Sequence, residues 1–151
     1  MKTITYFLYC LAFGLFTSIY AHSQHDHSAK DTTKAKKPFE ISAVFSTFMS
    51  DPELVKYKME SSVVTVAPKY TDTVSHLHDG ELFGYVMEGS VEIGLNHKAP
   101  VLFKTGQMFY EKRNIIHSFL KNPDEHITTR ILLITIIKEG RSGYTPIYSR
   151  K

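Results

Sequence analysis

The chain has 151 residues, of which 42% are hydrophobic, and its formal net charge is +3 at pH 7. That length suits one domain, and the hydrophobic fraction is ordinary for a globular protein. The charge is too small, and the basic residues beyond the N-terminal region too scattered, for a nucleic-acid-binding protein, so no nucleic acid is expected as a partner.

Residues 1–23 have the features of a secretory signal peptide. Lys2 is basic, residues 6–16 form an apolar run without charge, and residues 21–23 read Ala-His-Ser, a small-x-small cleavage pattern. Cleavage after residue 21 is the other option. The run is shorter than the about 20 residues of a membrane span, and an uncleaved N-terminal anchor is the alternative. We therefore expect an exported protein, periplasmic or extracellular, without membrane contact after cleavage.

The only cysteine, Cys10, lies inside this apolar run. A mature chain would then contain no cysteine. Disulfides, a cysteine nucleophile and a thiolate metal site are all excluded for it.

Residues 24–38 are predicted to be a polar linker rich in histidine and lysine, because they show no apolar period. The tract His22–His27 contains three histidines, and such tracts can bind metal ions. A short tract of this kind would bind weakly and without selectivity. A single folded domain is predicted over residues 39–151, with residues 140–151 as its polar tail.

The domain is expected to consist of short strands. Apolar residues alternate from Phe39 to Phe45, which predicts a first strand. Asp79-Gly80 and Glu88-Gly89 are tight-turn signals. Further strands are expected over residues 59–67, 74–78, 82–87, 91–95, 101–103, 107–110, 115–120 and 128–138. The last is apolar enough to be buried on both faces or nearly so. No long helical period is present, so the sequence predicts an all-β antiparallel barrel or jelly roll.

Three histidines form the candidate metal site. His76 and His78 are two residues apart, so on a strand both imidazoles point to the same face. His117 lies in a second patterned stretch, Gly106–Asn122. Imidazole is the commonest protein ligand for transition metals, so we expect one divalent metal ion, with Fe, Cu, Ni, Mn and Zn all open. The alternative is that these are hydrogen-bonded core residues. The loop histidines His97 and His126 are expected at the surface.

The order of these residues resembles the two motifs of the cupin superfamily. His76-x-His78 is followed by Gly89, and then by Gly106, His117 and Asn122, so the resemblance covers roughly residues 61–138. The phrases F-G-Y-V-M-E-G and G-Q-M-F-Y-E are similar to small single-domain bacterial cupins, some described as quercetin-dioxygenase-like. The resemblance implies a small antiparallel β-barrel, the double-stranded jelly roll, with one central metal held by the three histidines.

The sequence departs from the cupin pattern at Leu82. Cupins usually place a glutamate ligand there, seven residues before the motif glycine. Glu81 is adjacent, but a one-residue shift on a strand turns a side chain to the opposite face, so Glu81 would reach the metal only if the preceding turn were distorted. A three-histidine site follows, as in some cupin oxygenases of small thiols. In the second motif Lys112 and Asn114 replace the usual proline and glycine.

Glu111, after an aromatic strand, is the candidate catalytic residue, either as a proton carrier or as a fourth ligand. The alternative is a rim carboxylate paired with Lys112 or Arg113. Asp79 is expected to serve its turn and could also hold a ligand histidine. Most of six further residues are expected to be core, and no more than two or three of them to line a pocket: Phe83, Tyr85, Met87, Phe109, Tyr110 and Phe119.

The leading functional hypothesis is a metal-dependent, dioxygenase-like oxidoreductase acting on a small organic molecule. The alternative is a non-catalytic cupin module that binds a small ligand, which the loss of the usual glutamate favours. A metal-stabilised structural or storage protein is a third reading. The apolar stretch Ile131–Ile137 could also support a homodimer.

Overall fold

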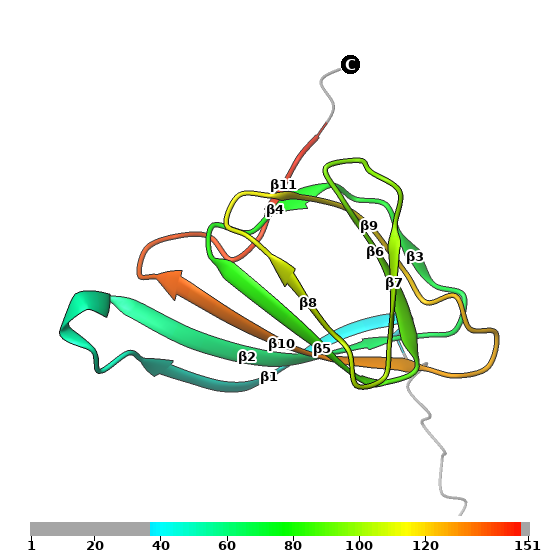
Figure 1. Ribbon diagram of the computed structural model, residues 1–151, viewed down its shortest axis with the longest axis horizontal. Helices are drawn as coiled ribbons and strands as arrows, with labels where there is room; N and C mark the ends of the chain where they lie inside the picture. Colours follow the sequence, from blue (N-terminus) through cyan, green and yellow to red (C-terminus); the bar gives the residue numbers. More distant parts are fainter. Residues whose placement is uncertain (1–36, 149–151) are drawn as a thin grey trace, which may run out of the picture. The chain divides into compact units, whose positions relative to one another are not determined.

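The computed structural model of the protein describes residues 37–148 (Figure 1). The described residues all belong to one unit. The predicted signal peptide and residues 24–36 of the predicted linker lie outside the described residues. Apart from one short 3-10 turn, η1 (Pro52–Leu54), the regular structure of the described part is all β. Within it no helix is long and apolar enough to span a membrane.

Two antiparallel sheets make up the domain. The first has five strands in the order β1 (Phe39–Phe48), β2 (Tyr57–Val66), β10 (Thr129–Lys138), β5 (Glu81–Glu88) and β8 (Met108–Glu111). The second follows the order β11 (Thr145–Pro146), β4 (His76–Leu77), β9 (Ile116–Lys121), β6 (Ser90–Leu95) and β7 (Val101–Lys104), with β3 (Thr71–Asp72) paired to β9. The predicted all-β jelly roll is confirmed.

The hydrophobic core lies between the two sheets because their strands alternate inward and outward residues. Its fully buried members are Val64, Val66, Leu82, Val86, Val91, Ile93, Phe109 and Ile131. In β10, Ile131 and Ile137 are buried whereas Leu132 and Ile134, on the opposite face, are only half-buried. The expectation that this strand is buried on both faces is therefore wrong for the single chain.

Two glycines allow close packing around the core. Gly89 joins β5 to β6 with a φ of +73°, and a Cβ there would lie 2.8 Å from Thr129 Oγ1, so this turn requires glycine. Gly84 points inward from β5, and a Cβ on it would lie 2.0 Å from Cζ of Phe109. Because Gly84 has no side chain, the Phe109 ring can pack against β5 at this position.

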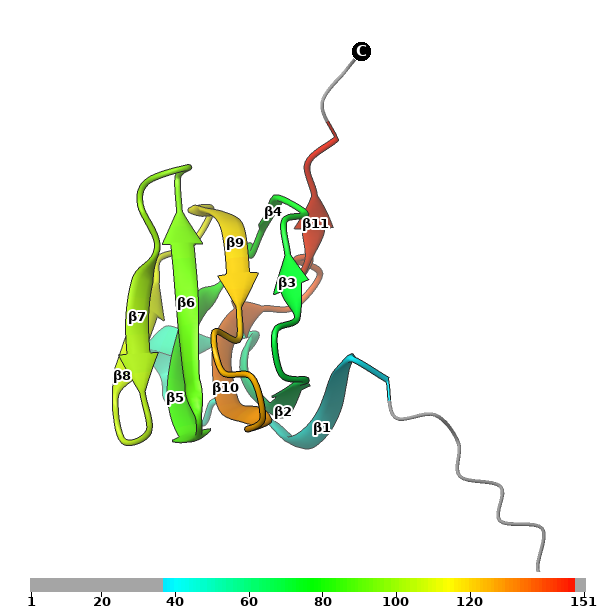
Figure 2. The same cartoon turned by 90° about the vertical axis from the view of Figure 1, so that its right-hand side faces the viewer.

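The C-terminal segment returns to the second sheet, as Figure 2 shows for β11 beside β4. Thr145 is opposite Leu77, and Pro146 is opposite His76. The polar tail expected over residues 140–151 therefore includes a paired strand. A two-residue strand has no periodicity to detect, so the sequence contains no signal for this pairing.

Candidate metal centre

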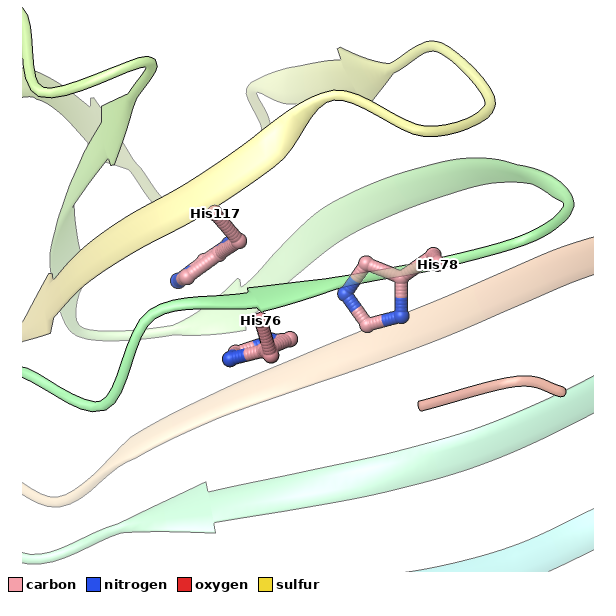
Figure 3. Close-up of side chains that lie close together, drawn as sticks. All are labelled: His76, His78 and His117. Carbon is pink, nitrogen blue, oxygen red and sulfur yellow. The ribbon is translucent and has the colours of Figure 1, made fainter. Parts of the chain in front are cut away.

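Three histidines gather at one end of the space between the sheets (Figure 3). His76 lies on β4 directly opposite His117 on β9, and His78 follows β4. One ring nitrogen from each lies within 4.8 Å of the others. His76 and His117 are stacked with ring centroids 4.7 Å apart. The three side chains are thus close enough to hold a metal ion.

Each of the three rings has its Nδ1 atom in a hydrogen bond to an oxygen. His76 Nδ1 lies 2.9 Å from the carbonyl oxygen of Val74, and His78 Nδ1 lies 2.7 Å from that of Gly143. His117 Nδ1 lies 2.9 Å from Glu111 Oε1. An oxygen acceptor requires Nδ1 to carry the proton, so a neutral ring in this arrangement presents its Nε2 lone pair to a metal. This donor set fits a divalent metal ion.

Burial also favours the ligand form of His76. Its side chain is buried, and desolvation holds its pKa below the ordinary value of 6.5, with the neighbouring histidines lowering it further. Only a neutral imidazole coordinates a metal, so burial keeps His76 ready to bind.

Glu111 lies inside the site and is only 1% exposed. One carboxylate oxygen, Oε1, accepts the hydrogen bond from His117, and the other, Oε2, lies 3.6 Å from His78 Nε2. Oε2 is buried and has no hydrogen-bond partner among residues 37–148. The alternative of a rim carboxylate paired with Lys112 or Arg113 is wrong, because Glu111 points inward from β8.

The position of Glu111 explains how the site has a carboxylate although Leu82 replaces the usual glutamate. Leu82 and Glu111 are directly opposite each other on β5 and β8, and opposite residues of antiparallel strands point to the same face. Glu81 lies on the other face, where its carboxylate accepts hydrogen bonds from the Tyr110 hydroxyl and from the backbone of Arg113. A role for Glu81 as a ligand is therefore ruled out in this conformation.

A cavity of ≈ 430 Å³ opens next to the histidines and Glu111. Of the six residues expected to supply pocket walls, only Phe109 lines it; Phe83 and Tyr110 stack on each other on the outer face of the first sheet. Tyr144 also lines the cavity and lies against His76, with ring centroids 4.4 Å apart. Burial and the charge of Asp72 raise the pKa of the Tyr144 hydroxyl, so this side chain stays a neutral phenol.

Sequence reasoning missed three contributors to the site. Val74 and Gly143 act through backbone carbonyls, which no residue type predicts, and Tyr144 lies in the segment expected to be a polar tail. For Tyr144 the only available signal was an aromatic residue in a polar region.

The remaining candidate residues are structural or lie at the surface. Asn122 is fully buried, and its amide donates to the carbonyls of Val66, Ala67 and Ile127, which is a structural role. Asp79 pairs with Arg113 rather than with a ligand histidine. The two loop histidines, His97 and His126, are exposed as expected.

Comparisons with known proteins agree with this architecture. Residues 62–135 match the Cupin_2 family model, described as a cupin domain. No curated protein matches the chain.

Solved structures with similar folds include several cupins. A cupin 2 domain-containing protein from Halorhodospira halophila has a TM-score of 0.56 at 14% identity, over 80% of this chain and 76% of that one. A cupin-like protein from Thermotoga maritima has a TM-score of 0.55 at 14% identity, over 74% and 77%. KdgF from Halomonas sp. has a TM-score of 0.51 at 16% identity, over 68% and 82%. Such identities show the fold alone. The family match over residues 62–135, together with the histidine motifs, shows that the chain contains a domain of the cupin superfamily.

Proposed function

We propose that the protein is a metal-dependent oxidoreductase of the dioxygenase-like type that acts on a small organic molecule. The observation behind this proposal is the set of three imidazoles, each with Nδ1 hydrogen-bonded to an oxygen, beside a cavity of ≈ 430 Å³. A divalent metal bound by three neutral ligands would keep open positions and serve as a Lewis acid or an electron conduit. The ligands accept Fe, Cu, Ni, Mn or Zn.

Glu111 is the catalytic residue of this proposal. Its Oε1 fixes the tautomer of His117, while Oε2 has no hydrogen-bond partner and lies near His78 Nε2. An unpartnered buried carboxylate oxygen accepts a proton readily from a donor placed beside it. Glu111 would therefore take a proton from a substrate bound in the cavity.

The test measures the metal content and oxygen uptake of the purified protein beside its His76→Ala and His117→Ala variants. About one transition metal per chain in the wild type, and loss of both metal and turnover in the variants, supports the proposal. A His22→Ala/His25→Ala/His27→Ala variant is the control for metal held by the N-terminal tract. Full turnover by a metal-free variant would overturn the proposal.

The second candidate function is a non-catalytic module that binds a small ligand. Leu82 stands in the usual glutamate position, and the Glu111 carboxylate is already engaged by His117, as a purely structural carboxylate would be. This function predicts saturable ligand binding with no product formed in the presence of metal and oxygen.

We also propose that the protein is exported to the periplasm or beyond the cell and that it forms a homodimer. The signal-peptide pattern of residues 1–23 supports export. Fractionation of expressing cells, with the mass of the mature chain, tests it: a mature N-terminus at residue 22 or 24 is expected. A full-length chain confined to the cytoplasm contradicts it.

The apolar outer face of the first sheet supports pairing of two copies.

A further inference from the structure

The walls of the cavity are mostly apolar. Nine of its fifteen lining residues are Phe, Ile, Leu or Val, and no lysine or arginine is among the described residues that line it. Its polar side chains are the three histidines, Tyr144 and two carboxylates, those of Asp72 and Glu111. Nothing in the lining could neutralise an anionic group on the body of a ligand.

The cavity continues into a second hollow of ≈ 530 Å³ along β1 and β2. The two share five lining residues, Ile41, His78, Leu82, Leu133 and Tyr144. In Figure 1 the ends of β1 and β2 that flank η1 project past the second sheet, which leaves this inner surface uncovered. We call this second hollow the β1 groove.

Exposed apolar side chains line the β1 groove. Ile41 and Val44 are each 60% exposed, and Phe45 is 54% exposed. The pairing of β1 with β2 shifts register between Ala43 and Phe45, and both Ala43 and Val44 line the groove. A β-bulge re-aims side chains in this way. The bulge therefore adds Val44 to an apolar surface that begins at the metal site.

The polar residues of the β1 groove are uncharged or paired. Serines and Thr135 contribute hydroxyl groups, and the single carboxylate, Glu60, forms a salt bridge with Lys58. The groove thus offers apolar contact and hydrogen bonds but no free positive charge.

We propose that the ligand of this site is an elongated, uncharged molecule with one metal-binding oxygen group at its head and an apolar body. The head lies at the three histidines and Glu111, and the body extends along Ile41 and Val44. This inference rests on the proposed metal site. Continuity of the two hollows determines the shape of the ligand, and the lining determines its charge.

The test uses alkyl hydroxamates, whose head group binds many transition metals, as probes of the metal-loaded protein. Affinity is measured by calorimetry for acetohydroxamate, hexanohydroxamate and octanohydroxamate. Burial of each methylene is expected to raise affinity about two- to fourfold. An octanohydroxamate analogue with a terminal carboxylate is expected to lose most of that gain, because its charge would have to leave water without a cationic partner.

A matched pair of variants locates the body of the ligand. Val44→Ser removes an exposed apolar side chain from the β1 groove, whereas Val55→Ser removes one that is 61% exposed and lines neither hollow. The double variant Ile41→Ser/Val44→Ser should lower the affinity for octanohydroxamate about tenfold. It should leave the affinity for acetohydroxamate unchanged. Val55→Ser should change neither.

Three outcomes would overturn the inference. Affinity independent of chain length means that another segment of the chain or a second copy fills the groove. If the analogue with a terminal carboxylate binds as tightly as octanohydroxamate, the ligand need not be uncharged. Failure of acetohydroxamate itself to bind a protein that retains its metal means that the metal has no open position, and then the proposed function falls with the inference.

Discussion

Glu111 is a buried carboxylate with one oxygen bonded and one free. Removing such a group from water is costly unless both oxygens find partners. Oε1 has the His117 ring, whereas Oε2 has only His78 Nε2 at 3.6 Å. A metal ion or a proton donor in the cavity would supply the missing partner of Oε2. For this reason Glu111 is expected to act on the ligand.

The Glu111→Gln substitution should separate the two roles of this residue. Glutamine would keep the side-chain volume and a carbonyl that can accept the His117 hydrogen bond, but it would lose the charge and the basic oxygen. We expect a folded protein, metal affinity lowered about 10–100-fold and turnover lowered about 10²–10⁴-fold. Metal titration and oxygen uptake measure the two effects. Glu81→Gln, on the opposite face, is the matched control. Unchanged turnover in Glu111→Gln would remove the residue from the mechanism.

His76 should make the stability of the metal-free protein depend on pH. Burial lowers its pKa in the folded state below the ordinary value of 6.5. At low pH the unfolded chain therefore binds a proton that the folded chain resists. The contribution of His76 to the free energy of unfolding should be constant above about pH 6.5. It should fall as the pH drops from there toward the lowered pKa of the folded state.

Thermal melting of the metal-free protein between pH 8 and pH 5 measures this dependence. In a His76→Gln variant the melting temperature should fall less steeply over the same range, because glutamine does not titrate. Parallel curves for the two proteins would show that the proton uptake of unfolding belongs to other groups.

Gly84 is the point at which strand β5 adjusts to the cavity. A methyl group there would overlap the Phe109 ring, with 2.0 Å to its Cζ atom, and crowding of this kind in a packed core costs about 1–3 kcal/mol. We expect Gly84→Ala to lower the free energy of unfolding by that amount and to displace Phe109 from the cavity wall. Denaturant titration is the measurement, with Gly143→Ala as control because its Cβ would meet nothing within 4 Å. Equal stability of the two variants would contradict this account of the packing.

Strand patterns and motif spacing predicted much of the fold, because alternation and turn residues are local signals. His76, His78 and His117 could be grouped in advance, since their motifs are local too. The placement of Glu111 could not, because it depends on the register that sets it opposite Leu82. The contacts of Gly143 and Tyr144 depend on a two-residue strand. The placement of Glu111 and the contacts of Gly143 and Tyr144 depend on tertiary structure, and neither leaves a periodicity or a motif in the sequence.

The outer face of the five-stranded sheet carries exposed apolar side chains that the candidate metal site does not use. Tyr85, Met87, Met108 and Tyr110 are between 38% and 56% exposed there, and Leu132, Ile134 and Ile136 continue the face across β10. Exposed apolar patches of several hundred Å² often mark a protein–protein interface. The five strands have 10, 10, 10, 8 and 4 residues. At about 3.4 Å per residue and about 4.8 Å between strands they offer roughly 700 Å², close to the about 800 Å² per partner of a stable interface.

A second copy of the chain is the occupant that we propose for this face, because a two-fold axis lets one apolar surface cover itself. Tyr85 lies directly opposite Met108 near one edge of the sheet. Because both copies of a two-fold dimer contribute the same surface, a charge introduced at Tyr85 would enter the interface twice. We expect sedimentation of the wild type at micromolar concentration to give the mass of a dimer, and Tyr85→Glu to give that of a folded monomer. Val55→Glu, 61% exposed and away from this sheet face, should remain dimeric. A monomeric wild type would mean that the apolar residues of β10 are covered by another partner, since the single chain leaves them half in water.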